Sequence, residues 1–214
     1  MLDKLLKKNE NTKETEKPVD QKDKALSNPI FRLPNNDGII HKNITEIDFN
    51  KFYTSIGMEF GFFPDHIKNY VQKVLEMDDK NIIKKLLLQP VVGMMKKEFY
   101  FNFYNPQAYE NIYKKSHEIM NDVCEYLKEN KFEVVYSFTD SLHVKNCEGK
   151  SEAPSASFSV DICSFVNAYL KEIKGYKFLS VKKTFLEKVR YFNYRYMGIL
   201  NGKFFQKGLI NKNS

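Results

Sequence analysis

Apolar residues recur at helical spacing in four stretches of this chain. The pattern predicts helices over 65–75 and 78–87, and a further helix within 158–174. A longer helix is predicted to begin at Pro106 and to run to about residue 127, with Lys, Glu and Asn opposite its apolar face. The segment from Gly57 to Pro64 is predicted to be a loop.

Runs of β-branched and aromatic residues predict the strands. Residues 44–47 form a short strand that ends in a tight turn, and residues 132–145 form a hairpin. Residues 176–209 also read as strands, and Asn201-Gly202 is typical of a hairpin turn. Strand, long helix, hairpin, helix and strand follow in a βαββαβ order, which predicts an α+β fold of the ferredoxin-like kind.

Two aspartates stand where predicted strands end. Asp48 follows the strand over 44–47, and Asp140 lies in the turn of the hairpin over 132–145. A single aspartate at a strand end is usually a cap or turn residue. Two carboxylates on neighbouring strand ends, however, can share hard divalent cations, which take oxygen ligands and leave positions for phosphate oxygens. The pair therefore indicates nucleotidyl transfer.

The surroundings of both aspartates resemble motifs of family B DNA polymerases. Motif A, D-x-x-S-L-Y-P-S-I, is matched at Asp48, Tyr53, Ser55 and Ile56, with Phe52 in place of Leu. Motif C, Y-x-D-T-D-S, is matched at Tyr136, Thr139, Asp140 and Ser141. Motif B, K-x-x-x-N-S-x-Y-G, keeps only Lys85 and Gly93. The resemblance covers about residues 43–209, and its short spacings are most similar to protein-primed polymerases of phages and organellar linear plasmids.

This resemblance implies a domain organisation. Residues 29–175 would form a polymerase palm of the ferredoxin-like βαββαβ fold, with a short two-helix fingers insertion at about 57–95. Residues 176–214 would form the C-terminal β-hairpin region of the palm, and a thumb would be absent. Residues 1–28 consist mostly of Lys, Glu, Asp, Asn and Gln, so a disordered charged tail is expected there.

The resemblance also implies roles for individual residues. Asp48 and Asp140 would be catalytic and would hold two Mg²⁺ ions together with the backbone carbonyl of Phe49, and Mn²⁺ could replace Mg²⁺. Four residues would meet the incoming dNTP: Lys85, Tyr53, Gln89 and Thr139. Four would meet the primer-template DNA: Lys183, Tyr196, Ser141 and Gly93. The K-x-Y element of the family fits near Lys183 by distance and near Tyr196 by the residues that follow, and both registers stay open.

Two departures from the family pattern support a second hypothesis. Phe138 replaces the first aspartate of motif C, and Gln89-Pro90-Val91-Val92-Gly93 replaces the helical end of motif B with a helix-breaking proline. A catalytically degenerate or split polymerase subunit, which binds nucleic acid or a partner chain, would also fit. In that case Tyr53 would be a core tyrosine and Lys85 a solvated helical lysine.

The aromatic run from Phe99 to Tyr104 has two interpretations. Five aromatic residues in near succession beside Lys96 and Lys97 suit stacking on single-stranded bases. Packing in a core or strand is the more common use of such a run. A third hypothesis, a ferredoxin-like binder of single-stranded RNA, would use these rings.

Composition limits the partners and the compartment. The net charge of +7 favours a polyanion such as DNA, although lysine is abundant throughout. The 3 cysteines lack zinc-ligand spacing, and no apolar run is long enough to cross a bilayer. An intracellular, cytoplasmic protein is therefore expected, or one of the organellar matrix if the gene is organelle-encoded. A terminal protein or a second polymerase chain are the protein partners that the resemblance implies.

Overall fold

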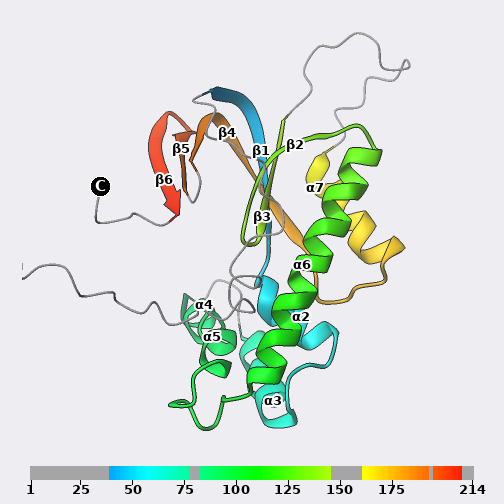
Figure 1. The fold of residues 1–214 in the computed structure, drawn as a ribbon, viewed down its shortest axis with the longest axis vertical. Coiled ribbons are helices and arrows are strands. Elements are labelled where there is room, and N and C mark those ends of the chain that lie inside the picture. The colour runs from blue at the N-terminus through cyan, green and yellow to red at the C-terminus, as the bar shows by residue number, and fades with distance from the viewer. Residues whose placement is uncertain (1–38, 78–81, 146–160, 193–194, 209–214) are drawn as a thin grey trace, which may run out of the picture.

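One antiparallel sheet organises the part of the chain that the structure describes (Figure 1). The computed structural model describes residues 39–77, 82–145, 161–192 and 195–208. The strands in these ranges are β1 (Ile40–Phe49), β2 (Glu133–Phe138), β3 (Ser141–Lys145), β4 (Val181–Phe192), β5 (Arg195–Leu200) and β6 (Lys203–Gly208). They lie in the order β2-β3-β1-β4-β5-β6, and each neighbouring pair is antiparallel.

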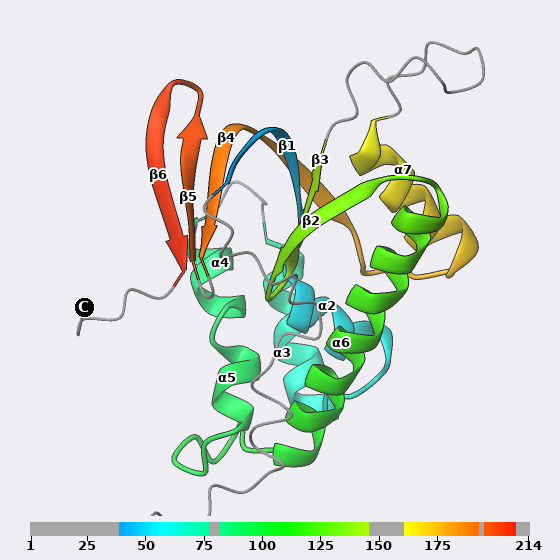
Figure 2. The same ribbon diagram turned by 45° about the horizontal axis from the view of Figure 1, so that its top comes forward.

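The helices lie between β1 and β4 in the chain. They are α2 (Phe52–Glu59), α3 (Asp65–Leu75), α4 (Ile82–Leu88), α5 (Val91–Met95), α6 (Pro106–Glu129), α7 (Ile162–Ala168) and the π-helical turn η1 (Tyr169–Ile173). Figure 2 shows α6 and α7 beside one face of the sheet, with α2 to α5 gathered below its end. Strand β1, helix α6, strands β2 and β3, helix α7 and strand β4 follow in βαββαβ order, so the predicted α+β fold is confirmed.

Alternation along β1 divides the core between the two faces of the sheet. Ile47 and Phe49 join the large apolar cluster formed with the helices, and Ile44 joins a smaller cluster on the opposite face. Because side chains two residues apart share a face, Glu46 and Asp48 belong to the face of Ile44. The two acids of β1, Glu46 and Asp48, therefore lie on the face opposite Ile47 and Phe49.

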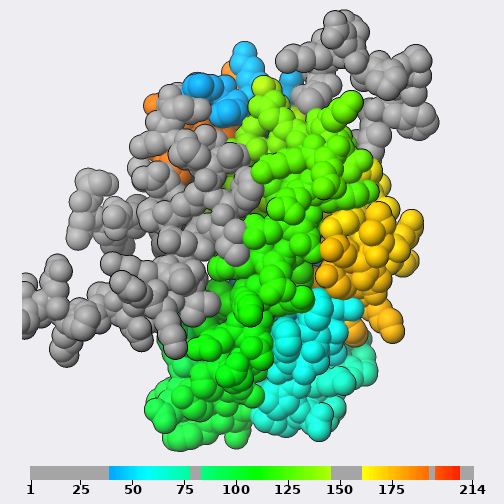
Figure 3. All heavy atoms as spheres, turned by 45° about the vertical axis from the view of Figure 1, so that its right-hand side comes forward, coloured from blue at the N-terminus to red at the C-terminus, as the bar shows by residue number. Residues whose placement is uncertain are grey.

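The long helix α6 begins where the sequence predicts. The side chain of Asn105 accepts a hydrogen bond from the backbone N–H of Ala108 at 3.0 Å, and Pro106 occupies the first turn. The residues buried along its inner face include Ile112, Ile119, Val123 and Leu127. Figure 3 shows the outer face of α6 running along the surface in green, with the yellow α7 and the cyan helices α2 and α3 along the same side of it.

Helix α2 overturns part of the prediction after Asp48. The expected loop from Gly57 to Pro64 is wrong for its first three residues, because α2 continues to Glu59. Lys51 turns the chain in the left-handed region at φ 48°, and the buried Phe52 and Ile56, four residues apart, then support a helix. The short helix α5 was not predicted either.

The aromatic run does not form a strand and is not wholly buried. Residues 96–104 form a series of turns, and 81% of Phe99 and 86% of Phe101 are exposed. Phe103 alone among the five rings packs against the core, where it meets the ring of Tyr70 edge-on at 5.5 Å. Core packing is therefore wrong for Phe99 and Phe101.

The hairpin β5–β6 turns at the predicted dipeptide. Asn201 and Gly202 both have positive φ, 49° and 71°, as a type I′ turn requires. The expected tail at 1–28 and the start of the segment 158–174 lie outside the described residues. Of the helices that the structure describes, none combines the length and apolarity needed to span a membrane.

Candidate active site

Two strand ends bring Asp48 and Asp140 together. In the antiparallel pairing of β1 with β3, Asp48 lies opposite Ser141, the neighbour of Asp140. The backbone N–H of Phe49 donates a hydrogen bond to the carbonyl of Asp140 at 2.9 Å. Main-chain pairing therefore holds the two acids in adjacent positions at one end of the sheet.

The turn that carries Asp140 is tightly hydrogen-bonded. Thr139 has a left-handed φ of 45°, which a β-branched residue rarely adopts. The backbone N–H of Asp140 donates to the carbonyl of Phe138 at 2.6 Å, and the hydroxyl of Ser141 donates to the same carbonyl at 3.1 Å. The Thr139 hydroxyl donates to Oδ1 of Asp140 at 3.0 Å. Thr139 and Ser141 thus shape the turn and orient the carboxylate.

The two acids differ in their electrostatic surroundings. Burial raises the pKa of Asp140, and the negative charge of Asp48 raises it further, whereas Thr139 and Lys207 act in the opposite direction. Asp48 instead forms an ion pair with Lys182, whose Nζ lies 3.0 Å from Oδ2. An added cation would therefore relieve the repulsion that Asp140 experiences.

A cleft of about 670 Å³ opens in front of the acid pair. Its lining contains seven of the residues singled out from the sequence: Asp48, Phe49, Tyr53, Lys85, Gln89, Gly93 and Asp140. The lining also contains residues that the sequence did not single out, among them Lys84, Tyr113 and Lys182. Strand ends of the sheet form one wall of this cleft, and helices α2, α4, α5 and α6 form the others.

Adjacent lysines on α4 have different surroundings. Lys84 is buried, and its Nζ donates to the carbonyls of Leu75 and Met77 at 2.8 Å each, so it joins α4 to the end of α3. Lys85 is exposed and lies at the rim of the cleft. Of these two lysines, Lys85 is therefore the one that can contact a charged ligand in the cleft.

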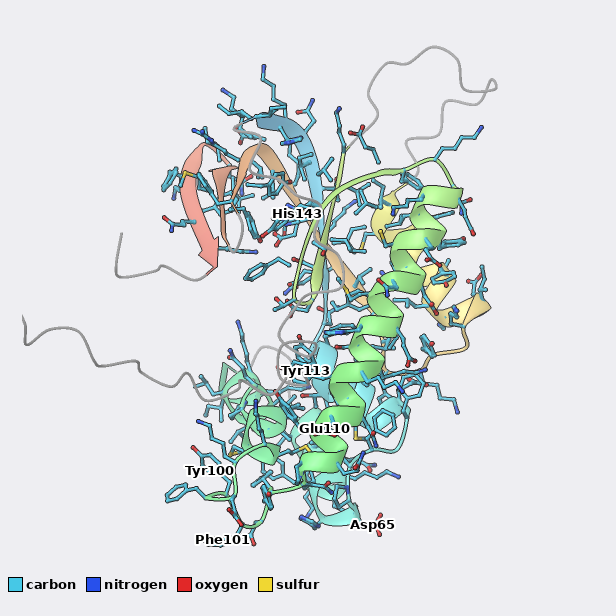
Figure 4. The ribbon with its side chains drawn as sticks, in the orientation of Figure 1. Asp65, Tyr100, Phe101, Glu110, Tyr113 and His143 are labelled. Carbon is cyan, nitrogen blue, oxygen red and sulfur yellow. The ribbon has the colours of Figure 1, made fainter. Side chains whose placement is uncertain are left out.

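Tyr53 and Tyr113 line another side of the cleft and begin a row of tyrosines that Tyr109 continues. The ring of Tyr53 stacks on that of Tyr113 at 5.0 Å, and Tyr113 contacts Tyr109 at 4.6 Å. Burial, with smaller contributions from Tyr113 and Asp140, raises the pKa of the Tyr53 phenol. Tyr53 is therefore a neutral side chain held flat against α6, where Figure 4 labels Tyr113.

Four of the predicted site residues lie outside the lining of this cleft. Thr139 and Ser141 form hydrogen bonds within the turn that carries Asp140. Lys183 pairs with Asp161 at 2.7 Å, because its partner across β1 is Ile47 on the helical face. Tyr196 is 1% exposed, and its hydroxyl donates to Glu46 at 2.5 Å. Lys182, one residue before Lys183, occupies the position opposite Asp48.

A buried polar network lies behind the acid pair on the same face of the sheet. Glu46 is 2% exposed and accepts hydrogen bonds from Tyr196 at 2.5 Å and from Lys207 at 2.8 and 3.0 Å. His143 faces it from β3, with Nε2 at 3.7 Å from Oε1 and Nδ1 at 3.0 Å from the hydroxyl of Tyr191. A neutral ring with its proton on Nε2 accepts a hydrogen bond from the Tyr191 hydroxyl at Nδ1 and turns its N–H toward Glu46, at a distance too long for a hydrogen bond.

This network fixes the charge of Glu46. Burial acts to raise the pKa of Glu46, but His143, Lys207 and Tyr196 together outweigh it and lower the pKa to about 2. Burial lowers the pKa of His143, which keeps the imidazole neutral, although Glu46 opposes this effect. Glu46 therefore remains a carboxylate, compensated mainly by Lys207. This network was not predicted, because its members Glu46, His143, Tyr191, Tyr196 and Lys207 come from five strands.

The acid pair offers oxygen ligands of the kind that Mg²⁺ prefers. Two carboxylates and the nearby backbone of Phe49 supply hard oxygen donors at the cleft, and burial, followed by the charge of Asp48, raises the pKa of Asp140. Among the residues that the structure describes, no group of three or more His, Cys, Asp or Glu side chains could hold a metal ion. Cations at this pair would therefore need further oxygen atoms, such as those of substrate phosphates or water.

Comparison with known proteins identifies a related fold. No protein-family model and no curated protein sequence matches the chain. Among solved structures, the chain is similar to the family B DNA polymerase from the hyperthermophilic archaeon Pyrobaculum calidifontis, with a TM-score of 0.55 and 18% identity. The match covers 79% of this chain and 27% of the polymerase chain, so this chain spans about a quarter of that polymerase. At this identity the comparison shows the fold alone, and the fold is one that a family B DNA polymerase contains.

Proposed function

We propose that the chain is the palm and fingers part of a family B-type DNA polymerase, and that it transfers nucleotides at the acid pair. The observation that carries this proposal is the convergence of Asp48 and Asp140 on one wall of the cleft that Lys85 and Tyr53 also line. Sequence positions almost a hundred residues apart meet there, in the order that the polymerase motifs require. The related fold supports the proposal independently of those motifs.

Each lining residue would have a distinct task in this reaction. Asp48 and Asp140 would hold two Mg²⁺ ions, with the carbonyl of Phe49 as a further ligand. When bound, such ions activate the primer hydroxyl and stabilise charge on the leaving pyrophosphate. Lys85 would pair with the triphosphate of the dNTP, and Gln89 would contact it from the end of α4. Tyr53, backed by Tyr113, would form the wall against the sugar.

The exposed cations and small residues of the cleft would hold the substrates in place. Gly93 is exposed, and no atom lies within 4 Å of the position that a Cβ would occupy, so a nucleic acid backbone could approach α5 closely there. Lys182 would exchange Asp48 for a substrate phosphate once cations bind. Primer-template DNA is therefore the proposed ligand, and a terminal protein as primer remains a prediction from the motif spacings.

A second candidate function rests on the surroundings of Phe138. This residue replaces a motif C acid, and its ring contacts that of Tyr196 edge-on at 6.1 Å. With Lys182 compensating Asp48, the acid pair has fewer negative charges than the motif provides. A non-catalytic or split subunit that binds DNA, and that needs a second chain for activity, is the corresponding proposal.

Primer extension with Mg²⁺ or Mn²⁺ separates these candidates. We expect Asp140→Asn and Asp48→Asn to lower the rate by at least about 10²-fold, because each removes a charge that stabilises the transition state. Asp122→Asn is the matched control, since Asp122 forms an exposed ion pair with Lys174 on the far side of α6. Equal rates for wild type and Asp140→Asn would rule out catalysis by this pair. Primer-template binding without extension would favour the second candidate.

A further inference from the structure

A group of aromatic rings is exposed at the end of the fingers helices. We call residues 96–104, between α5 and α6, the aromatic loop. The exposed fractions of its outer rings are 81% for Phe99, 38% for Tyr100, 86% for Phe101 and 41% for Tyr104. Scattered exposed apolar residues are normal, but a contiguous aromatic patch commonly marks a binding site. Figure 4 shows Tyr100 and Phe101 projecting at this end of the molecule.

The backbone of the aromatic loop is ordered by hydrogen bonds. Phe103 and Tyr104 both donate their N–H groups to the carbonyl of Tyr100, at 2.7 and 2.8 Å. The ring of His66 on α3 contacts the carbonyl of Asn102 at 2.7 Å, and Asn105 donates to the carbonyl of Met95 at 2.9 Å. The loop therefore presents its rings from a fixed frame, which lowers the entropic cost of binding.

The charge of the loop suits a polyanion. Lys96 and Lys97 are exposed at its start and outnumber its single acid, Glu98. Exposed rings beside lysines are the usual elements of a single-strand site, since bases stack on the rings while phosphates pair with the ammonium groups.

Two structural connections join the loop to the cleft. Helix α5 carries Val92 and Gly93 in the cleft lining and ends at Met95, directly before the loop. The tyrosine row provides the second connection, because Tyr109 follows Tyr53 and Tyr113, and Nζ of Lys96 lies 5.5 Å from the ring centre of Tyr109. Five helical residues span about 7.5 Å, and nucleotides along one strand are about 3.4 Å apart. A strand that leaves the cleft along α5 would therefore reach the loop within a few nucleotides.

From these observations we infer that the aromatic loop is a stacking platform for single-stranded DNA that extends from the cleft. The path from cleft to loop rests on the proposed function, whereas binding of a single strand to the loop does not. Phe99 and Phe101 supply the stacking surfaces, and Lys96 and Lys97 pair with phosphates.

Fluorescence anisotropy with a labelled oligo-dT of about 15 nucleotides, in EDTA and without dNTP, tests the platform apart from catalysis. The variant Phe99→Ala/Phe101→Ala is expected to bind more weakly by about tenfold or more, because removing each ring removes the stacking energy of one base. Phe204→Ala is the matched control, since Phe204 is 69% exposed on β6 and outside the loop. Its affinity should stay within about twofold of wild type. Lys96→Gln/Lys97→Gln should lower the salt dependence of binding by about 1.4 in the slope of log K against log salt.

Several outcomes would overturn the inference. Failure of wild type to bind oligo-dT would do so, and so would an unchanged affinity in the double phenylalanine variant. An equal loss of affinity in Phe204→Ala would overturn it as well. Tenfold tighter binding of oligo-rU would assign the loop to RNA instead. A dimer that sedimentation detects in wild type, and that the double variant loses without change in DNA affinity, would assign the loop to a second copy of the chain.

Cross-linking tests the path from the cleft. A primer-template with 5-iododeoxyuridine at successive positions of the template overhang is expected to cross-link to the aromatic loop within the first few unpaired nucleotides. Cross-links only at distant positions or only outside the loop would contradict the path. Asp48→Asn/Asp140→Asn should retain oligo-dT binding, so unchanged extension by this variant with intact oligo-dT binding would overturn the proposed function and leave the platform standing.

Discussion

Lys182 on β4 and Asp48 on β1 form an ion pair, with Nζ 3.0 Å from Oδ2. The two residues are direct partners in the antiparallel pairing of β1 with β4, so the ammonium group is placed by the sheet itself. Without an added cation, Lys182 is the counter-charge of Asp48. Any divalent ion at the acid pair must therefore compete with a lysine that is already present.

Replacement of Lys182 by Gln is expected to strengthen Mn²⁺ binding at the acid pair. The side chains of Lys182 and Asp48 are 60% and 25% exposed, and such partly exposed pairs contribute about 0–1 kcal/mol, which corresponds to a gain of up to about fivefold. Titration of the Mn²⁺ EPR signal measures the effect. Lys183→Gln is the control, because Lys183 pairs with Asp161 instead. Equal changes in both variants would attribute the gain to net charge.

Removal of the Asp48 charge is expected to lower the pKa of Asp140. Burial and the charge of Asp48 both raise that pKa, and Asp48→Asn removes the second cause alone. Carboxyl ¹³C NMR titration of Asp140 measures the change, with Asp122→Asn as the control. An unchanged pKa would show that the two carboxylates do not interact.

A raised pKa in the folded state also predicts a stability effect. Such a group favours folding at low pH, and this contribution is lost as the pH rises through the folded pKa. Asp140→Asn should therefore be more stable than wild type at pH 7, with the difference shrinking as the pH falls. Urea unfolding at several pH values measures it, and a less stable variant at pH 7 would contradict the interpretation.

The buried Glu46 is expected to make the fold sensitive to acid. Its pKa is about 2, against an ordinary value of 4.5, so its stabilising contribution is present above about 4.5 and is lost as the pH falls toward 2. The shift corresponds to about 3 kcal/mol. Glu46→Gln should lose stability of this order at pH 7 and show a weaker acid dependence in urea unfolding. Glu133→Gln, at an exposed ion pair with Lys145, should change stability by less than about 1 kcal/mol.

Two helical glycines are expected to respond oppositely to alanine. At Gly57 a Cβ would lie 2.2 Å from the buried ring of Phe63, so Gly57→Ala should destabilise the fold by about 1–3 kcal/mol. At Gly93 the Cβ would enter open space, and Gly93→Ala should stabilise by about 0.5–1 kcal/mol. If DNA approaches α5 at Gly93, the same variant should bind primer-template more weakly. Thermal unfolding and anisotropy together measure both effects, and a destabilised Gly93→Ala would contradict this account.

Periodicity predicted the elements whose apolar positions form a regular stripe. Helix α6 combines a capping Asn105, Pro106 and a long apolar face, and the hairpin β2–β3 alternates around a polar turn, so both were found within a few residues. Helix α2 was missed because Asn50, Lys51, Thr54 and Ser55 resemble a turn. Its support comes from tertiary contacts of Phe52 and Ile56, which local sequence does not contain.

Side chains alternate between the two faces of a strand, and the sequence alone did not show which of two adjacent residues faces the site. Lys182 and Lys183 are adjacent, and only the register of β4 against β1 decides which of them faces Asp48. Alternation from the buried Val181 places Lys182 on the face away from the large core. It does not show which residue of β1 lies opposite Lys182, because that depends on how the two strands pair. Tyr196 and Lys207 meet Glu46 only after β5 and β6 have joined the sheet, so their shared site depends on pairings about 150 residues apart in sequence.

The hydrogen bond from Phe49 to the carbonyl of Asp140 uses only main-chain atoms. Either carboxylate can therefore be exchanged for another side chain without removing the tie that holds the two segments together. This makes the site suitable for engineering: cysteine or histidine at positions 48 and 140 would inherit the same spacing and could be screened for softer metals. The main chain of the sheet therefore sets where the two side chains lie, and the side chains alone set the chemistry of the site.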